Sequence, residues 1–234
     1  MIKKKIGRLI AIEGVDGSGK STLRDYLVDR LNERGTKAVG TYEVGGTPVG
    51  KELRSIAFTK RSDEIIDPTT RLLLVYAARL QHIRTLIEPS ILNGLDVVTD
   101  RFNASTRVYQ GSLDNQAALM NSIEAIAPLR VLGTRPDYVI YLKIDAETSV
   151  NRVKQRAVND NDQYKGDIAK AARLVQYYDK EMEKQNLHLP NSVFTIDATR
   201  SIDQVKRDID EFVHGFRLLK EKYAEFPSTL VSDR

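Results

Sequence analysis

Short apolar runs alternate along the chain with stretches in which apolar residues recur every three or four positions. The runs predict strands at residues 8–12, 38–42, 96–99, 138–144 and 193–196. The periodic stretches predict helices between them, the first from about Lys20 to Arg34. Alternating strands and helices are typical of an α/β fold with a parallel sheet. No repeat or linker divides the pattern, so we expect one domain over residues 1–221 and a polar tail over 222–234.

Two further helices have clear starting signals. Asp67 and Pro68 suit the N-cap and the first helical position, and an unusually apolar stretch follows as far as Gly94. We expect this helix to be covered on more than one side, by the core and by a partner subunit. Ser201 precedes the last helix. Residues 157–167 contain almost no apolar side chain, which predicts a mobile polar loop.

Composition and charge narrow the class of protein. The chain is 41% hydrophobic and 29% charged, as in ordinary globular proteins, and no apolar run is long enough for a membrane helix. Residues 1–5 resemble the start of a signal peptide, but Arg8 and Glu13 interrupt the segment that follows, so we expect a cytoplasmic protein. The absence of cysteine excludes disulfides and cysteine zinc sites. A net charge of +4 suits a small anion such as a nucleotide and is too weak for a protein that coats nucleic acid.

Residues 14–21 satisfy the phosphate-binding pattern G-x-x-x-x-G-K-[ST] and lie between a predicted strand and a predicted helix. Glycines let the backbone curl so that several N–H groups point at phosphate oxygens. Lys20 is expected to reach the β- and γ-phosphates, and the Ser21 hydroxyl to bind Mg²⁺. The predicted ATP-binding residues are Gly14, Asp16, Gly17, Ser18, Gly19, Lys20, Ser21 and Thr22. No guanine-reading N-K-x-D segment is present, which argues against a signalling GTPase.

Four charged residues, one in this turn and three elsewhere, carry further signals, and the first of them suggests a second ligand near the turn. Asp16 places a carboxylate close to phosphates, where it is unfavourable unless it contacts something else. Asp100 and Arg101 follow the third strand, at the edge where parallel sheets bind ligands; the alternative is a surface ion pair. Arg79 lies on the apolar helix and needs either a structural carboxylate partner or a polar ligand.

Five collinear segments within about residues 8–216 together resemble the thymidylate kinase family. Residues 12–22 are similar to the family's E-G-x-D-G-x-G-K-[ST]-T opening, and residues 41–54 to T-R-E-P-G-G-T-P followed by E-x-[IL]-R. Residues 72–82 are similar to L-L-L-F-A-A-D-R-A-Q-H, and residues 100–111 to D-R-[YF] followed by S and A-Y-Q-G. Residues 136–156 resemble the strand and helix that lead into the family's lid.

The resemblance implies transfer of the γ-phosphoryl group of ATP to the 5′-phosphate of dTMP, giving dTDP for dTTP synthesis, with Mg²⁺ as cofactor. It also implies a three-layer P-loop kinase fold with a five-stranded parallel sheet, a lid at about 152–167 and a homodimer through the helix at 68–93. The implied catalytic residues are Lys20, Arg101, Arg152 and Arg156, and the implied Mg²⁺ ligands are Ser21 and Asp100.

The resemblance also implies which residues bind dTMP. They are Asp16, Arg54, Val75, Arg79, Arg101, Ser105, Tyr109 and Gln110. Asp16 would bind the 3′-hydroxyl, Arg101 the acceptor phosphate and Arg79 a thymine carbonyl. Ser105 and Gln110 would lie along the base and sugar.

The chain departs from the family pattern at several positions. Tyr42 stands where the family has arginine, with Arg54 as the compensating cation, and Val75 stands where the family has the aromatic that stacks on thymine. The lid motif D-R-x-E is rewritten over residues 162–165. Gly17 is typical of members whose catalytic arginines come from the lid.

These departures leave three alternatives. One is a broader deoxynucleoside monophosphate kinase, since the base-stacking aromatic is missing. Another is a deoxynucleoside kinase with Glu43 as general base, although a neutral acceptor has no need of Arg101. The third is a nucleotide-binding protein without catalysis.

Overall fold

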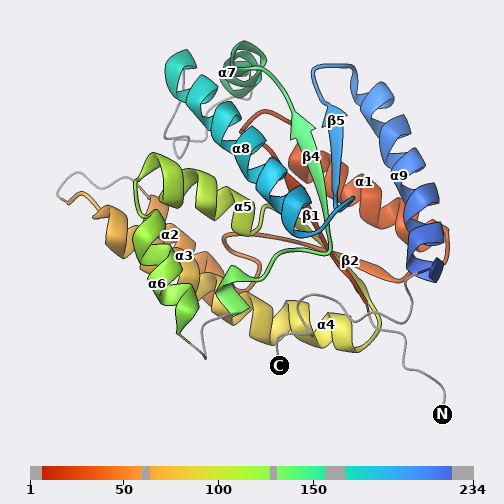
Figure 1. Cartoon of the computed structure of the whole chain (residues 1–234), viewed down its shortest axis with the longest axis horizontal. Helices are drawn as coiled ribbons and strands as arrows, with labels where there is room; N and C mark the ends of the chain where they lie inside the picture. The colour runs from red at the N-terminus through yellow and green to blue at the C-terminus, as the bar shows by residue number, and fades with distance from the viewer. Residues whose placement is uncertain (1–6, 60–63, 127–130, 156–166, 223–234) are drawn as a thin grey trace.

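The computed structural model describes residues 7–59, 64–126, 131–155 and 167–222. In these residues one five-stranded parallel sheet, in the order β2-β3-β1-β4-β5, lies between layers of helices (Figure 1). The strands are β1 (Leu9–Glu13), β2 (Ala38–Tyr42), β3 (Asp96–Asp100), β4 (Tyr138–Lys143) and β5 (Val193–Asp197). The predicted α/β fold and all its predicted strands are confirmed.

The helices of the described residues connect these strands. They are α1 (Lys20–Glu33), α2 (Pro48–Phe58), α3 (Pro68–His82), α4 (Glu88–Leu92), α5 (Asn103–Thr106), α6 (Ala117–Ala125), α7 (Ala146–Gln155), α8 (Ile168–His188) and α9 (Ile202–Lys222). Two π-helical stretches, Ile83–Ile87 and Arg107–Leu113, follow α3 and α5.

The two faces of the sheet are covered by different helices. Successive strand residues point to opposite faces, and on β4 the Tyr138 ring packs edge-on against Phe216 of α9 at 5.2 Å, whereas the Tyr141 ring stacks on Tyr178 of α8 at 6.0 Å. Helix α1 packs beside α9, because Tyr26 and Arg30 both bond Asp210. Figure 1 shows α8 on the near side of the strands.

The carboxyl ends of the three strands on one side of the sheet meet at one point. Ile12 of β1 and Tyr42 of β2 both pair with Asp100 of β3. The loop after β1, the end of β2 and the residues after β3 therefore face a common space, which is where open α/β sheets bind ligands.

The region predicted as one long apolar helix, 68–93, consists of three consecutive helical segments that end at Leu92. The Asp67 side chain accepts hydrogen bonds from the amides of Thr69 and Thr70, so the predicted cap is confirmed. The helix then passes through the π-helical stretch Ile83–Ile87 into α4. The predicted lid loop at 157–167 lies outside the described residues except for Asp167, and the tail at 222–234 except for Lys222. None of the helices in the described ranges has the length and apolarity needed to cross a membrane.

Candidate active site

The predicted phosphate loop forms a tight turn between β1 and α1. Gly14, Gly17 and Gly19 have φ values of 147°, 83° and 93°, which side chains rarely adopt. Space excludes side chains as well: a Cβ at Gly14 would lie 2.6 Å from the Leu142 carbonyl oxygen. Helix α1 begins at Lys20, so its first amides face the concave side of the turn. The Ser18 hydroxyl is buried there with no hydrogen-bond partner among the residues described.

Lys20 lies inside this turn. Its ammonium group is buried and donates a hydrogen bond of 2.9 Å to the Val15 carbonyl oxygen. Burial, together with the nearby Arg101 charge, lowers the pKa of Lys20 from 10.5 to about 8. A bound anion would favour the charged form of this lysine and reverse the shift.

Ser21 and Asp100 lie side by side at the end of β3. The Ser21 hydroxyl donates a hydrogen bond of 2.6 Å to the Asp100 carboxylate. Hydroxyl and carboxylate oxygens are the hard donors that Mg²⁺ prefers, and one or two such protein ligands suffice when phosphates and water supply the rest. The predicted pair therefore fits a magnesium ion bound together with a phosphorylated ligand. No cluster of three or more His, Asp or Glu that could hold a metal by itself occurs in the described ranges.

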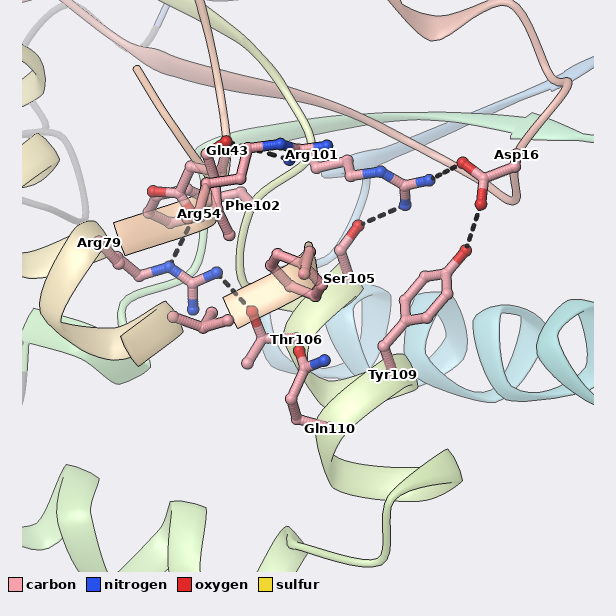
Figure 2. Close-up of a pocket in the computed structure, with 13 residues that line it drawn as sticks. Asp16, Glu43, Arg54, Arg79, Arg101, Phe102, Ser105, Thr106, Tyr109 and Gln110 are labelled. Atoms are coloured by element: carbon pink, nitrogen blue, oxygen red, sulfur yellow. Dashed lines mark hydrogen bonds and ion pairs between the residues drawn. The ribbon is translucent and has the colours of Figure 1, made fainter. Parts of the chain in front are cut away.

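Arg101 is the centre of a hydrogen-bond network behind the phosphate loop. Its guanidinium ion-pairs with Asp16 at 2.6 Å and donates to the Ser105 hydroxyl at 3.0 Å (Figure 2). It also donates to the Tyr178 hydroxyl at 2.8 Å. Arg101 itself has a φ of 68°, a strained value for a residue with a side chain. Its contacts with Asp16, Ser105 and Tyr178 fix the position of this side chain, which suits a residue that positions a ligand.

The charges in this network stabilise one another. Burial raises the pKa of Asp16, but the charges of Arg101 and Lys20 outweigh it and hold that pKa below the ordinary value. Burial alone would lower the pKa of Arg101, yet the surrounding Tyr178, Tyr109 and Asp16 oxygens raise it well above its usual range. Asp16 is therefore an anion and Arg101 a cation at neutral pH.

Glu13, the last residue of β1, binds the residues that follow Arg101. Its carboxylate accepts hydrogen bonds from the Phe102 amide at 2.8 Å and from the Ser105 hydroxyl at 2.6 Å. Burial raises the pKa of Glu13, although the hydrogen bond from Ser105 and the Arg101 charge oppose the rise. Glu13 thus fixes the turn that carries Arg101 and Ser105.

Two cavities meet at Asp16 and Arg101. The loop cavity, of about 400 Å³, is lined by Asp16, Gly17, Gly19, Lys20, Ser21, Arg24, Tyr42, Glu43, Arg54, Asp100 and Arg101. The α2–α3 cavity, of about 140 Å³, is lined by Asp16, Glu43, Val44, Arg54, Phe58, Val75, Arg79, Arg101, Phe102, Ser105, Thr106, Tyr109 and Gln110. Four residues line both cavities: Asp16, Glu43, Arg54 and Arg101. A ligand in one cavity can therefore contact residues that also line the other.

Arg79 has both a structural partner and a free donor. Its Nε bonds the Glu43 carboxylate at 2.7 Å and its Nη2 bonds the Thr106 hydroxyl at 2.6 Å (Figure 2). The remaining nitrogen, Nη1, is buried and has no hydrogen-bond partner in the part of the chain described. Because an unpaired buried donor is costly, this nitrogen is positioned to bind an acceptor on a ligand in the α2–α3 cavity.

Glu43 is not available as a general base. One carboxylate oxygen binds Arg79, and the other lies 3.2 Å from the His82 imidazole, which in turn bonds the Thr41 hydroxyl at 2.7 Å. Burial raises the pKa of Glu43, but the charges and hydrogen bonds of Arg79 and His82 hold it below the ordinary value. A carboxylate engaged on both oxygens and hard to protonate positions Arg79.

Of the two predicted lid arginines, the structure describes Arg152, whose Cβ lies beside the phosphate loop but whose guanidinium points to other partners. The Arg152 guanidinium donates to the carbonyl oxygens of Ala198 at 2.6 Å and Thr199 at 3.1 Å, in the loop after β5. Arg156 lies outside the described residues. The catalytic roles of both arginines remain predictions.

Several residues of the site were not predicted from the sequence. Thr106, Phe58 and Tyr178 carry no motif, and Glu43 was considered only as a base. Tyr178 comes from the middle of α8, 77 positions from Arg101, so only the packing of α8 on the sheet brings the two together. Thr106 is the last residue of α5 and directly follows the predicted Ser105; that neighbour was the only indication of its role in the sequence.

Comparisons with known proteins agree on one family. A family model described as thymidylate kinase matches residues 12–209. A thymidylate kinase of Legionella pneumophila (strain Paris) is 35% identical over 210 residues, 90% of this chain and 95% of the relative. One from Francisella philomiragia is 34% identical over 204 residues, 87% and 96% of the two chains. One from Pseudomonas putida (strain GB-1) is 35% identical over 212 residues, 89% and 96%.

Proposed function

The chain belongs to the thymidylate kinase family, and we propose that it transfers the γ-phosphoryl group of ATP to the 5′-phosphate of dTMP, giving dTDP for dTTP synthesis. The observation that carries the proposal is the meeting of two cavities at Arg101. The loop cavity takes the ATP phosphates, and the α2–α3 cavity takes the nucleoside of dTMP. The two phosphoryl groups then approach end to end beside one guanidinium.

The reaction needs positioning and charge neutralisation more than a base. The acceptor is a phosphate oxygen that is largely ionised at neutral pH, because the second pKa of a phosphate monoester is about 6. Lys20 and the loop amides spread the negative charge on the γ-phosphoryl group, and Arg101 aligns the acceptor. A Mg²⁺ ion, held between Ser21, Asp100 and the ATP phosphates, would supply further charge neutralisation.

The α2–α3 cavity recognises the rest of dTMP. The Arg79 Nη1 group donates to a carbonyl of the base, which gives this buried nitrogen its missing partner. Asp16 accepts a hydrogen bond from the 3′-hydroxyl while it keeps its ion pair with Arg101. Tyr109, whose hydroxyl lies 3.3 Å from Asp16, and Gln110 line the sugar and the base.

A broader deoxynucleoside monophosphate kinase is the second candidate. The observation that favours it is Val75, an aliphatic residue at the position where the family pattern carries an aromatic. A deoxynucleoside kinase is disfavoured, since Glu43 is engaged by Arg79 and His82. A homodimer through α3 and a cytoplasmic location complete the proposal.

One assay separates these candidates. ADP release from ATP and Mg²⁺ is measured with dTMP, dUMP, dCMP, dGMP and thymidine as acceptors. We expect the highest kcat/KM with dTMP and no turnover with thymidine. Similar values for all four monophosphates would favour the broader kinase, and ATP binding without ADP release on any acceptor would contradict the proposal.

The control for this assay is Lys20→Ala. Loss of the ammonium group should lower kcat by about 10³-fold, since it removes charge stabilisation in a buried site. The circular dichroism spectrum should be unchanged, because the variant removes a buried charge and leaves the glycine turn intact. Activity like that of the wild type would contradict the role given to the phosphate loop.

A further inference from the structure

Three aromatic rings line the α2–α3 cavity, and two of them are already covered. The Phe102 ring is fully buried, with the Arg79 guanidinium 5.0 Å from its centroid. The Tyr109 ring has the Arg101 guanidinium 5.2 Å from its centroid and meets the Tyr178 ring edge-on. Phe58, the last residue of α2, is partly buried, as Tyr109 is, and the Arg54 guanidinium lies 5.7 Å from its centroid. Unlike Tyr109, Phe58 meets no second ring among the described residues, so it has ring surface left to offer a ligand.

Helix α3 also lines the cavity and offers no ring. Val75 lines the cavity and is 1% exposed, and its aliphatic side chain has no π surface. The neighbouring Tyr76 does not line the cavity, and its hydroxyl bonds Glu124 at 2.6 Å. A nucleobase in this cavity gains affinity by stacking on an aromatic ring, and α3 does not supply that contact.

The last turn of α2 presents two groups in an order that matches a nucleotide. Arg54 and Phe58 are four positions apart, so they share one helix face, and the Arg54 guanidinium lies 5.7 Å from the Phe58 ring centroid. Arg54 lines both cavities, whereas Phe58 lines only the α2–α3 cavity. The cation thus faces the junction where a phosphate binds, and the ring lies farther from it, where the base binds.

We infer that Phe58 is the specificity-determining ring of this enzyme: the pyrimidine base of the acceptor stacks on Phe58 of α2 in place of a ring at Val75. The inference rests on the proposed function, since it assumes that dTMP occupies the α2–α3 cavity. Arg79 then fixes an edge of the base and Phe58 covers one face, while the aliphatic Val75 adds no second ring.

The test is the affinity for dTMP, measured by isothermal titration calorimetry without ATP. Phe58→Leu keeps an apolar side chain and removes the ring. We expect it to raise the Kd for dTMP about tenfold and the KM for dTMP similarly, with kcat and the KM for ATP within twofold. The double variant Phe58→Leu, Val75→Phe returns a ring to the cavity from α3 and should recover most of the lost affinity.

A matched control removes a ring far from the site. Phe194 on the edge strand β5 is also partly buried and packs on Phe212 at 5.5 Å. Phe194→Leu should leave the Kd for dTMP unchanged. An unchanged Kd in Phe58→Leu, or an equal loss in Phe194→Leu, would overturn the inference. Absence of dTMP turnover in the wild-type chain would instead overturn the proposed function, so the two failures are distinguishable.

Discussion

At the scale of single residues, the site contains a buried positive charge that a bound phosphate would stabilise. Lys20 is a buried cation, and burial lowers its pKa despite the carboxylates nearby. Burying a cation costs free energy unless an anion accompanies it. Arg101 is partly buried and paired with Asp16, so in the free protein this cost falls on Lys20, and binding of ATP relieves it.

This charge arrangement predicts how ATP binding depends on pH. Burial lowers the pKa of Lys20 to about 8, and bound phosphates favour its protonated form. Above pH 8 the free protein loses a proton that the complex retains, so the affinity for ATP should fall by up to about tenfold per pH unit. Calorimetry at pH 9 in two buffers of different ionisation enthalpy should detect proton uptake on binding.

The control for this prediction is Lys20→Arg, whose guanidinium does not titrate in this range. Its ATP affinity should show no step above pH 8. The stability of the free protein should change in the opposite sense: the unfolded lysine binds protons up to about pH 10.5, so the contribution of Lys20 to stability rises between pH 8 and 10.5. An ATP affinity that stays flat in the wild type would contradict the assigned pKa.

The sequence predicted local features of the site better than its long-range contacts. The glycine turn, Lys20 and Ser21 could be found because their spacing follows from how a strand, a turn and a helix bind phosphate. Asp100 could be found because it ends a predicted strand, where open α/β sheets bind ligands. The Glu43 partner of Arg79 is 36 positions away, and Tyr178 lies still farther from Arg101. Such pairs depend on how helices pack on the sheet, which residue spacing does not specify.

At the scale of elements, buried apolar strands were predictable and several helices were not. Each strand is a short apolar run, and β1 is buried along its whole length. Helices α2, α6 and α8 were not predicted, although α8 carries buried apolar residues at helical spacing (Ala171, Leu174, Tyr178 and Met182). Helix α2 begins where Thr47 caps the Gly50 amide at 3.0 Å and Pro48 occupies the first turn, a start signal that could have been recognised.

The helical region at 68–93 departs from regular α-helical hydrogen bonding near Pro89. Pro89 has no amide hydrogen and cannot bond the Thr85 carbonyl four residues before it. The chain passes through the π-helical stretch Ile83–Ile87 immediately before this proline. Such stretches shift the hydrogen-bond frame by one residue, so the helix continues without a break.

A second prediction belongs to the contact between helices. Arg107 bonds Glu124 of α6 at 2.5 Å and lies 3.8 Å from Glu181 of α8, and all three side chains are largely buried. Arg107→Met leaves two buried carboxylates with fewer partners, so we expect the free energy of unfolding in urea to fall by about 2 kcal/mol. Lys143→Met breaks a half-exposed pair with Asp179 and should cost less than about 0.5 kcal/mol. Equal losses of unfolding free energy in the two variants would contradict a larger contribution from the Arg107 contacts.

At the scale of the whole molecule, three exposed apolar side chains of the described residues lie on the neighbouring helices α2 and α3. Leu73 on α3 is 50% exposed, and Ile56 and Val49 on α2 are 41% and 47% exposed. Single exposed apolar residues are normal, but several on neighbouring elements favour a protein contact. This surface is the one that a homodimer through α3 would cover.

The dimer is testable by light scattering after size exclusion. We expect the wild-type chain to elute with twice the mass of one chain, and Leu73→Glu, which buries a charge in such a contact, to elute as a monomer. Leu187→Glu changes an 83% exposed leucine on α8 and should leave the mass unchanged. A monomeric wild type would contradict the proposed dimer.

The missing side chain at Gly17 has a mechanical consequence. A Cβ there would lie 2.8 Å from the Ser149 carbonyl oxygen of α7, and the Ser149 hydroxyl donates a hydrogen bond of 2.6 Å to the Asp16 carbonyl oxygen. Helix α7 therefore rests directly on the loop. A residue with a side chain at this point would displace the helix from the loop. Because the two are in direct contact, a triphosphate that shifts the loop would shift α7 as well.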